Sequence, residues 1–249
     1  MVLGLIGAGN MASALARGFG EPVLVADALP ARAEALAAEV GGEALASNAE
    51  VASRADVVLL AHKPAQLADV SAEIEPRAVA SILGGTKVAD VEQAYPGRPV
   101  YRFLPNIPAE VRRGVTCYVP GRRAADGPEA ELVGLFERVG AVVRLDEALV
   151  EPAMALMSCG PAFLALVVEA MVDAGVHHGL PAPEARTLTL ETMAGTAAML
   201  DELDIEPHEL RRRVTSPGGS TARGLAALEA GGLRTAFHDA VAAVAGGAR

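Results

Sequence analysis

A pair of closely spaced glycines lies near the start of the chain, within Gly7-Ala8-Gly9-Asn10-Met11-Ala12. This spacing, G-x-G-x-x-G/A, follows the apolar run Val2–Ile6 and precedes a segment of helical periodicity at 11–19. In such a turn the first glycine allows a sharp bend, the second lets the backbone approach a diphosphate, and the following helix directs its N-terminus at the phosphates. The flanking strand and helix favour this interpretation over an ordinary glycine turn. The predicted dinucleotide contacts are Ile6, Gly7, Ala8, Gly9, Asn10 and Met11.

Asp27 follows the second apolar run, Pro22–Ala26, at about the 20-residue spacing expected after the glycines. A carboxylate at this position accepts hydrogen bonds from ribose hydroxyls and repels a 2′-phosphate, which favours NADH over NADPH. Arg32 would offset that repulsion, and a solvated turn residue is the alternative interpretation of Asp27. The predicted cofactor is therefore NAD(P)H, with Asp27 leaning toward NADH.

A second glycine-rich turn, Ser216-Pro217-Gly218-Gly219-Ser220-Thr221, precedes a helical segment in the second half of the chain. Consecutive glycines before a helix leave several backbone N–H groups unpaired, and such a nest binds a carboxylate or a phosphate. The alternative is a plain helix cap, in which the hydroxyl of Ser220 or Thr221 accepts from the first turn. The paired glycines favour the anion cradle, because a cap needs only one hydroxyl.

The second half also lacks the usual proton donors of carbonyl reductases. It contains no lysine and no tyrosine, and its histidines have no orienting carboxylate motif and form no i, i+4 pair: His177, His178, His208 and His238. Reduction of a ketone leaves an alkoxide that needs an acid. A cyclic imine can bind already protonated, so that positioning supplies most of the catalysis. The sequence therefore favours reduction of C=N over reduction of C=O.

Aliphatic runs alternate with helical segments through the first half. Strands are predicted at 2–6, 22–26, 56–61, 78–83, 100–103, 115–119 and 141–145, and helices at 11–19, 30–40, 65–74 and 128–138. Continuous apolar strands between helices are typical of a doubly wound, mainly parallel α/β sheet covered on both faces, which is the Rossmann fold.

After residue 149 the pattern is helical only, at 161–179, 183–203, 207–214, 220–229 and 233–245. A helical domain that is so apolar and of this size is expected to bury surface against a partner chain. The predicted domains are residues 1–147 (Rossmann) and 148–249 (all-α).

Composition excludes several classes of function. The chain of 249 residues carries 21 basic and 31 acidic side chains, a net charge of −10, which argues against nucleic-acid binding. Cys117 and Cys159 form no metal-ligand or disulfide pattern, which fits a reducing cytoplasm and predicts no metal site. The longest uncharged run, 152–168, is expected to be too short to span a membrane.

At these motifs the chain resembles the Δ1-pyrroline-5-carboxylate reductases, which reduce a cyclic imine to proline. The resemblance is carried by the opening glycine turn, by Val214–Thr221, and by three shorter segments: Ala61-His62-Lys63-Pro64, Leu104-Pro105-Asn106-Ile107-Pro108-Ala109 and Gly160-Pro161-Ala162-Phe163. It covers nearly the whole chain in register. Val214–Thr221 is its most specific part.

The resemblance implies roles for further residues. Asn48, Ala61, His62, Lys63, Leu83, Gly84 and Asn106 would contact the coenzyme, for which NADPH is the family default. The substrate would lie on Gly218, Gly219, Ser220 and Thr221, near Glu147, with the Thr221 hydroxyl as the catalytic contact to the ring nitrogen. The helical domain would bind substrate and form a homodimer, or a higher multiple of dimers.

Three alternatives remain open on sequence alone. One is a related dehydrogenase of β-hydroxy acids, against which the missing lysine of the second domain counts. Another is a reductase of a different cyclic imine, since one ring methylene changes binding only modestly. The third is a non-catalytic dinucleotide sensor, which would not need to keep Thr221 and its glycines.

Overall fold

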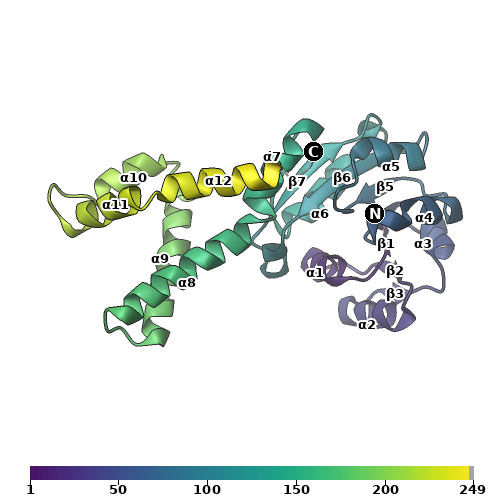
Figure 1. The fold of residues 1–249 in the computed structure, drawn as a ribbon. Coiled ribbons are helices and arrows are strands. Elements are labelled where there is room, and N and C mark those ends of the chain that lie inside the picture. The colour runs from purple at the N-terminus through teal and green to yellow at the C-terminus, as the bar shows by residue number, and fades with distance from the viewer. Residues whose placement is uncertain (247–249) are drawn as a thin grey trace. The chain divides into compact units, whose positions relative to one another are not determined.

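The structure, a computed structural model, describes residues 1–246 and divides the chain into two compact units, Met1–Ala153 and the residues from Met154 onward. The first unit is a sheet with helices on both faces, and the second is helical throughout its described residues (Figure 1). This arrangement confirms the predicted class, an α/β Rossmann domain followed by an all-α domain.

The sheet has eight strands in the order β3-β2-β1-β4-β5-β6-β7-β8. All neighbouring strands are parallel except β6 and β7. Because β1 lies between β2 and β4, the winding reverses at the carboxyl end of β1, where open α/β sheets bind their ligands. The strands are β1 (Leu3–Ile6), β2 (Leu24–Ala26), β3 (Glu43–Ala44), β4 (Val57–Leu60), β5 (Val79–Ser81), β6 (Val100–Pro105), β7 (Gly114–Pro120) and β8 (Gly140–Arg144).

Two hydrophobic clusters lie on the two faces of this sheet. Alternate strand residues face opposite sides, so Leu5 and Leu59 join one cluster while Ile6 and Leu60 join the other. The first cluster packs under α1 (Asn10–Phe19), α2 (Pro30–Val40) and α6 (Glu129–Glu137), and the second under α3 (Asn48–Arg54), α4 (Leu67–Glu73) and α5 (Val88–Ala94). Short 3-10 turns complete the unit: η1 (Pro64–Gln66), η2 (Ile107–Val111), η3 (Ala124–Asp126) and η4 (Glu147–Leu149).

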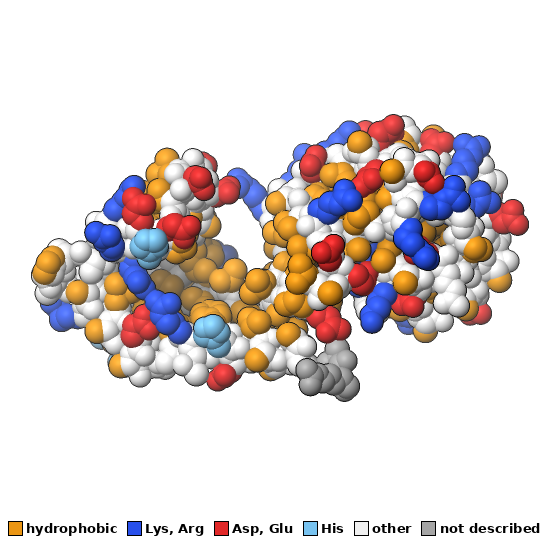
Figure 2. Space-filling view, turned by 90° about the horizontal axis from the view of Figure 1, so that it is seen from above, with side chains coloured by type: hydrophobic (Ala, Val, Ile, Leu, Met, Phe, Trp, Pro, Cys, Tyr) orange, Lys and Arg blue, Asp and Glu red, His pale blue; other side chains and the backbone are white. Residues whose placement is uncertain are grey.

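The second unit is built from longer helices with little core of their own. Its elements are α8 (Gly160–His177), α9 (Ala182–Glu202), α10 (Pro207–Arg213), α11 (Ser220–Ala230) and α12 (Leu233–Ala245), and α7 (Val150–Met157) lies across the division between the units. Both hydrophobic clusters belong to the first unit. In the described part of the second unit, large apolar side chains stay exposed, including Leu156 at 70% and Leu166 at 65% (Figure 2). An exposed apolar surface of this kind marks an interaction site.

The apolar helices are longer than the uncharged run at 152–168, which was expected to be too short to span a membrane. The helical run Glu147–His177, 31 residues, is long and apolar enough to cross a membrane by length and composition. The uncharged stretch ends at Val168, but beyond it only Glu169 and Asp173 interrupt the apolar pattern of α8. A turn at Ser158 and Cys159 separates α7 from α8, so the run consists of two helices.

Candidate active site

The turn after β1 is built so that only glycine fits its first position. Gly7 has φ +103°, in the region that L-residues rarely adopt, and its N–H donates to Ala26 O at 2.8 Å. A Cβ on Gly7 would lie 2.7 Å from the carbonyl carbon and oxygen of Ala61. The ends of β1 and β4 therefore meet at Gly7, at the switch point of the sheet.

Gly9 differs from Gly7, because its backbone is ordinary and the space beside it is open. It has φ −73°, and a Cβ added there would meet nothing within 4 Å. Gly9 is the N-cap of α1, and no side chain caps this helix. Ala12 in the first turn is 1% exposed, packed between helix and sheet. The bare first turn of α1 thus faces open space, which suits a diphosphate.

A cavity of about 540 Å³ opens at this edge of the sheet. Eight of the predicted coenzyme residues line it: Ile6, Gly7, Gly9, Asp27, Asn48, Ala61, His62 and Lys63. They come from the ends of β1, β2 and β4 and from the start of α3, so the topology assembles residues that lie far apart in the sequence.

Both carboxylate oxygens of Asp27 are held by backbone amides. Oδ2 accepts from Ala8 N at 2.7 Å, and Oδ1 accepts from Leu29 N at 2.8 Å. Asp27 therefore fixes the glycine turn as well as lining the cavity. A carboxylate has about four acceptor positions, so capacity for a ribose hydroxyl remains. Arg32, at the start of α2, lines the same cavity.

His62 follows β4 and faces the cavity with a half-buried ring. Its Nδ1 lies 2.9 Å from Lys63 O, and its Nε2 is buried without a hydrogen-bond partner among the described residues. Burial lowers the pKa of His62, and the hydrogen bond to Lys63 O opposes that shift in part. The imidazole is therefore neutral near pH 7.

The second glycine-rich turn forms the N-terminus of α11 within the helical unit. Gly218 has φ +68°, Gly219 is the N-cap, and no side chain caps the helix. The structure therefore does not show the cap predicted as the alternative, in which Ser220 or Thr221 would accept from the first turn. Ser220 and Thr221 are exposed. The Gly219 N–H donates to Ser216 O at 3.0 Å, so the N–H groups left to hold a small anion are those of the first helical residues, Ser220 and Thr221.

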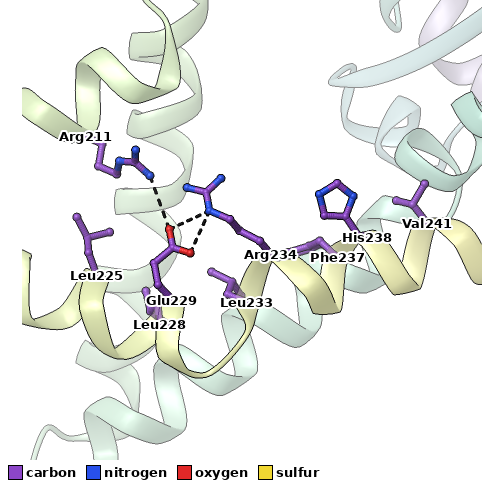
Figure 3. A pocket seen from close by; sticks show the side chains of 9 residues that line it. All are labelled: Arg211, Leu225, Leu228, Glu229, Leu233, Arg234, Phe237, His238 and Val241. Atoms are coloured by element: carbon purple, nitrogen blue, oxygen red, sulfur yellow. Dashed lines mark hydrogen bonds and ion pairs between the residues drawn. The ribbon is translucent and has the colours of Figure 1, made fainter.

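The helical unit also carries an apolar groove of about 600 Å³ (Figure 3). Its walls come from α10, α11 and α12, and the apolar ones are Leu225, Leu228, Leu233, Phe237 and Val241. Glu229 pairs with Arg234 at 2.8 Å and with Arg211 at 4.0 Å along the groove. Such an apolar groove with a charged border fits another helix better than a polar substrate.

Comparison with known proteins decides the family. Residues 147–249 match the family described as pyrroline-5-carboxylate reductase dimerisation. The pyrroline-5-carboxylate reductase of Synechocystis sp. is 36% identical, over 97% of this chain and 94% of the relative. The chain belongs to the pyrroline-5-carboxylate reductase family. The member from Methanosarcina acetivorans is 34% identical, over 96% of this chain and 93% of its own.

Solved structures of the family agree along the whole length. The Coxiella burnetii pyrroline-5-carboxylate reductase has a TM-score of 0.89 at 30% identity, covering 98% of this chain and 96% of its own. The Plasmodium falciparum reductase, solved with NADP bound, has a TM-score of 0.84 at 27% identity, covering 98% and 95%. Residues 2–84 also match a family described as NADP oxidoreductase, coenzyme F420-dependent. Residues 147–249 are thus the dimerisation domain of this reductase family.

The remaining residues that were predicted from the family lie outside the main cavity. Ala8 and Asn10 line one neighbouring hollow, and Asn10 and Met11 line another. Leu83 is 2% exposed as a whole residue and packs in a hydrophobic cluster. Gly84 is exposed, and Asn106 Oδ1 accepts from Val115 N at 2.8 Å.

Glu147, expected at the substrate from its place in the reductase family, is already engaged. Its Oε1 pairs with the Arg102 guanidinium, and its Oε2 accepts from Val88 N at 3.1 Å. These contacts lie within the first unit.

Sequence reasoning did not include several residues that line the cavity: Ala26, Ala28, Leu29, Pro64, Gln66 and Val70. Ala26, Ala28 and Leu29 flank Asp27 at the end of β2, so the motif that singled out Asp27 also marked them. Pro64 and Gln66 belong to η1 directly after β4. The pairing of β4 with β1 brings the segment after β4 to the cavity. That pairing is not visible in the sequence, so Pro64 and Gln66 were not identified as lining residues.

Proposed function

We propose that this chain reduces the C=N bond of Δ1-pyrroline-5-carboxylate to give proline, the last step of proline synthesis, with hydride from a nicotinamide dinucleotide. Relatives named for this activity are 31–36% identical over nearly the full length. The structural observation that carries the proposal is the uncapped N-terminus of α11 at Gly219. A dinucleotide-binding sensor would not need this second anion site.

The coenzyme is proposed to lie at the carboxyl edge of the sheet. A bound reduced nicotinamide dinucleotide supplies the hydride. Gly7 and Gly9 leave room for a diphosphate, and the first turn of α1 offers unpaired N–H groups to it. The proposed contacts that line the cavity and its neighbouring hollows are Ile6, Gly7, Ala8, Gly9, Asn10, Met11, Asp27, Asn48, Ala61, His62 and Lys63. Leu83, Gly84 and Asn106 are proposed as further contacts from the family resemblance alone.

The substrate carboxylate is proposed to bind at the turn formed by Gly218, Gly219, Ser220 and Thr221. An uncapped helix start offers several N–H donors and the positive end of the dipole of α11, an 11-residue helix. The exposed Thr221 hydroxyl is proposed to contact the ring nitrogen. It can both donate and accept, so it serves the iminium and the amine product alike.

The chemistry requires orientation more than acid catalysis. His177, His178, His208 and His238 are exposed. An imine that binds protonated becomes a neutral amine when hydride arrives, so no group on the protein has to give up a proton in that step. Holding the two reactants in the right geometry can supply about 7–11 kcal/mol of barrier reduction.

Coenzyme preference is proposed to depend on Asp27 and Arg32. Asp27 holds the glycine turn and places negative charge where a 2′-phosphate would lie, which favours NADH. Arg32 lines the same cavity and supports binding of NADPH as well. We therefore expect use of both coenzymes, with a lean toward NADH.

The partner is proposed to be a second copy of this chain, seated on the apolar groove of α10, α11 and α12. The dimerisation match spans these helices, and α8 exposes Leu164, Leu166 and Met171, which are suited to such a groove. Burial of about 25 cal/mol per Å² of apolar surface would hold the pair together. Burial against the second copy also accounts for the apolar composition of α7 and α8, so we propose no membrane association.

We propose 147/148 as the domain boundary, because the dimerisation match begins at Glu147 while Glu147 itself contacts the first unit. A cytoplasmic location is proposed as well, supported by the free thiols of Cys117 and Cys159.

An assay of coenzyme oxidation tests the activity. Absorbance of NADH and of NADPH is followed after pyrroline-5-carboxylate, its six-membered homologue or a keto acid is added to the reduced coenzyme, and after a β-hydroxy acid is added to NAD⁺ or NADP⁺. We expect oxidation with the five-membered imine, faster than with the homologue, and no coenzyme turnover with the other two acids. Turnover of no cyclic imine would favour a sensor, and turnover of the hydroxy acid would favour the dehydrogenase.

A further inference from the structure

A buried arginine lies in the sheet beside the loop that leads into α5. Arg102, on β6, has a side chain only 3% exposed, and its Nε has no hydrogen-bond partner among the described residues. It pairs in register with Ser81 of β5. Its guanidinium bonds to Glu147, whose side chain is 29% exposed. A charge this buried holds its partner firmly, because leaving it unpaired is costly.

Glu147 connects this arginine to the far end of the loop, residues 82–87. Its second oxygen accepts from Val88 N, the first residue of α5. The near end is tied as well, since Leu83 N donates to Ser81 Oγ at 3.3 Å. Within the loop, Thr86 N donates to Leu83 O at 3.3 Å. The carboxylate of Glu147 therefore joins β6, the loop and the start of α5.

This loop carries Leu83 and Gly84, and Gly85 after them has φ +74°. Gly84 and Gly85 are exposed and have no atom within 4 Å of an added Cβ, so side-chain packing does not hold the loop there. Leu83 is packed in a hydrophobic cluster near the start of the loop, so the course of the exposed glycines depends on this packing and on the hydrogen bonds at the two ends of the loop. At the Val88 end, the backbone N–H donates to Glu147, a residue that belongs neither to the loop nor to α5.

We propose that Glu147 is a positioning residue, which acts through Val88 and Arg102 to hold the 82–87 loop against the nicotinamide. This inference rests on the proposed function, because it takes the loop to lie at the hydride donor. The loop follows β5 at the carboxyl edge of the sheet, next to the end of β4 that lines the coenzyme cavity. It assigns Glu147 no contact with the substrate. Both of its oxygens already have partners within the first unit.

The test compares Glu147→Ala with Glu147→Gln in steady-state kinetics, using coenzyme deuterated at the transferred position. Ala removes the acceptor for Val88, whereas Gln keeps one acceptor oxygen for Val88 N and replaces the other, together with the charge, by an NH2 group that cannot accept from Arg102. We expect Glu147→Ala to lower kcat about tenfold and to raise the deuterium isotope effect on kcat, since misplaced reactants slow the hydride step. The KM for the imine stays within about twofold, and Glu147→Gln keeps most of kcat.

Glu92→Ala is the matched control, at a glutamate within α5. Glu92 also accepts from a backbone amide, Arg122 N at 2.6 Å, and pairs with the Arg122 guanidinium at 2.9 Å. Its loss is expected to lower the melting temperature and to leave the isotope effect unchanged. Should Glu147→Ala fail to fold, Arg102→Met combined with Glu147→Ala carries the same measurement without an unpaired buried charge.

Two results would overturn the inference. If both Glu147 variants raise the KM for the imine strongly, Glu147 contacts the substrate. If both lower the melting temperature but keep the wild-type kcat and isotope effect, the pair is structural only. Failure of the proposed function is distinguishable, because the wild-type protein itself would then not reduce the imine.

Discussion

At the scale of single residues, we expect the two halves of the chain to have separate tasks. Asp27 and the Gly7 turn belong to the coenzyme cavity, and Thr221 belongs to the substrate cradle. No described hydrogen bond ties the Thr221 hydroxyl into the structure as a cap. The two groups should therefore respond independently to substitution.

Thr221→Ala should lower kcat for imine reduction by about tenfold or more while coenzyme affinity changes less than about twofold. The hydroxyl is exposed and does not cap α11, so the fold should not depend on it. Thr221→Ser, which keeps the hydroxyl, is the control and should retain most of the activity. Equal loss of turnover and of stability would show that Thr221 supports the helix instead.

Asp27→Asn should raise the ratio of kcat/KM for NADPH to that for NADH by about tenfold, because it removes the negative charge beside the ribose. Asparagine keeps a carbonyl oxygen for one of the two amides that Asp27 holds, Ala8 N and Leu29 N. Arg32→Ala is the opposing variant and should lower that ratio. An unchanged ratio in Asp27→Asn would remove Asp27 from coenzyme discrimination.

His62 should make the folded chain sensitive to mild acid. Burial lowers its pKa below the usual 6.5, so the unfolded chain takes up a proton more readily than the folded one. The contribution of neutral His62 to stability is therefore complete above about pH 6.5 and is lost as pH falls toward the folded pKa. Urea unfolding from about pH 7.5 to pH 5 should show less loss in His62→Val than in wild type.

The exposed His208 provides the control, since His208→Val should follow the wild-type curve. Identical pH dependence in wild type and in His62→Val would contradict the buried, neutral state of His62.

At the scale of elements, the long periodic segments were predictable and the short ones were not. Each strand of the parallel sheet that was predicted is present, and α1, α2, α6, α9 and α12 start and end within a few residues of expectation. The missed strand and helices are β3, α3, α5 and α7, of two, seven, seven and eight residues. Two turns of helix show too little periodicity to stand out.

A capping signal at α3 was nevertheless readable in the sequence. Ser47 Oγ accepts from Glu50 N at 3.2 Å, and Glu50 Oε2 accepts from Ala46 N at 3.3 Å. A serine followed three residues later by glutamate is a helix-start signature. The apposition of Gly7 with Ala61, in contrast, follows from strand order, which one sequence without its fold does not reveal.

Substitutions at the two glycines after β1 should have separate effects on the free energy of unfolding and on coenzyme binding. Gly7→Ala forces an L-residue into φ +103° and a Cβ against Ala61, so we expect a loss of unfolding free energy of about 1–3 kcal/mol or more. Gly9→Ala meets open space and should leave that free energy nearly unchanged, but raise the coenzyme Kd about tenfold by occupying the diphosphate position.

Gly134→Ala in α6, also with open space around its Cβ, is the control and should alter neither coenzyme binding nor activity. Calorimetry and coenzyme titration on the three variants measure both effects. Coenzyme affinity at wild-type level in Gly9→Ala would place the diphosphate elsewhere.

At the scale of the whole molecule, the two units differ in how they are stabilised. The α/β unit contains both hydrophobic clusters, while the described helices of the second unit expose leucines along their length. Composition alone indicated a partner chain for these helices. The groove between α10, α11 and α12 was not predictable, because it depends on how three helices pack.

Leu228→Glu should weaken the dimer. Leu228 is 52% exposed in the single chain and lines the groove, where a partner would bury it. A buried leucine contributes about 1.5–3 kcal/mol, so losing it and burying a charge should raise the dimer Kd by about a hundredfold or more. Light scattering on a size-exclusion column gives the mass. Val143→Glu, at a side chain 43% exposed on β8, is the control and should stay dimeric.

We propose that two bare helix starts bind the two anions, the diphosphate at α1 and the substrate carboxylate at α11. A crystal structure of the protein with NAD⁺ and proline would show both sites. We expect the diphosphate within hydrogen-bond distance of the amides at 9–11, and the proline carboxylate on the amides at the start of α11, with Ser220 N and Thr221 N as donors. A proline carboxylate bound away from the α11 turn would contradict this proposal.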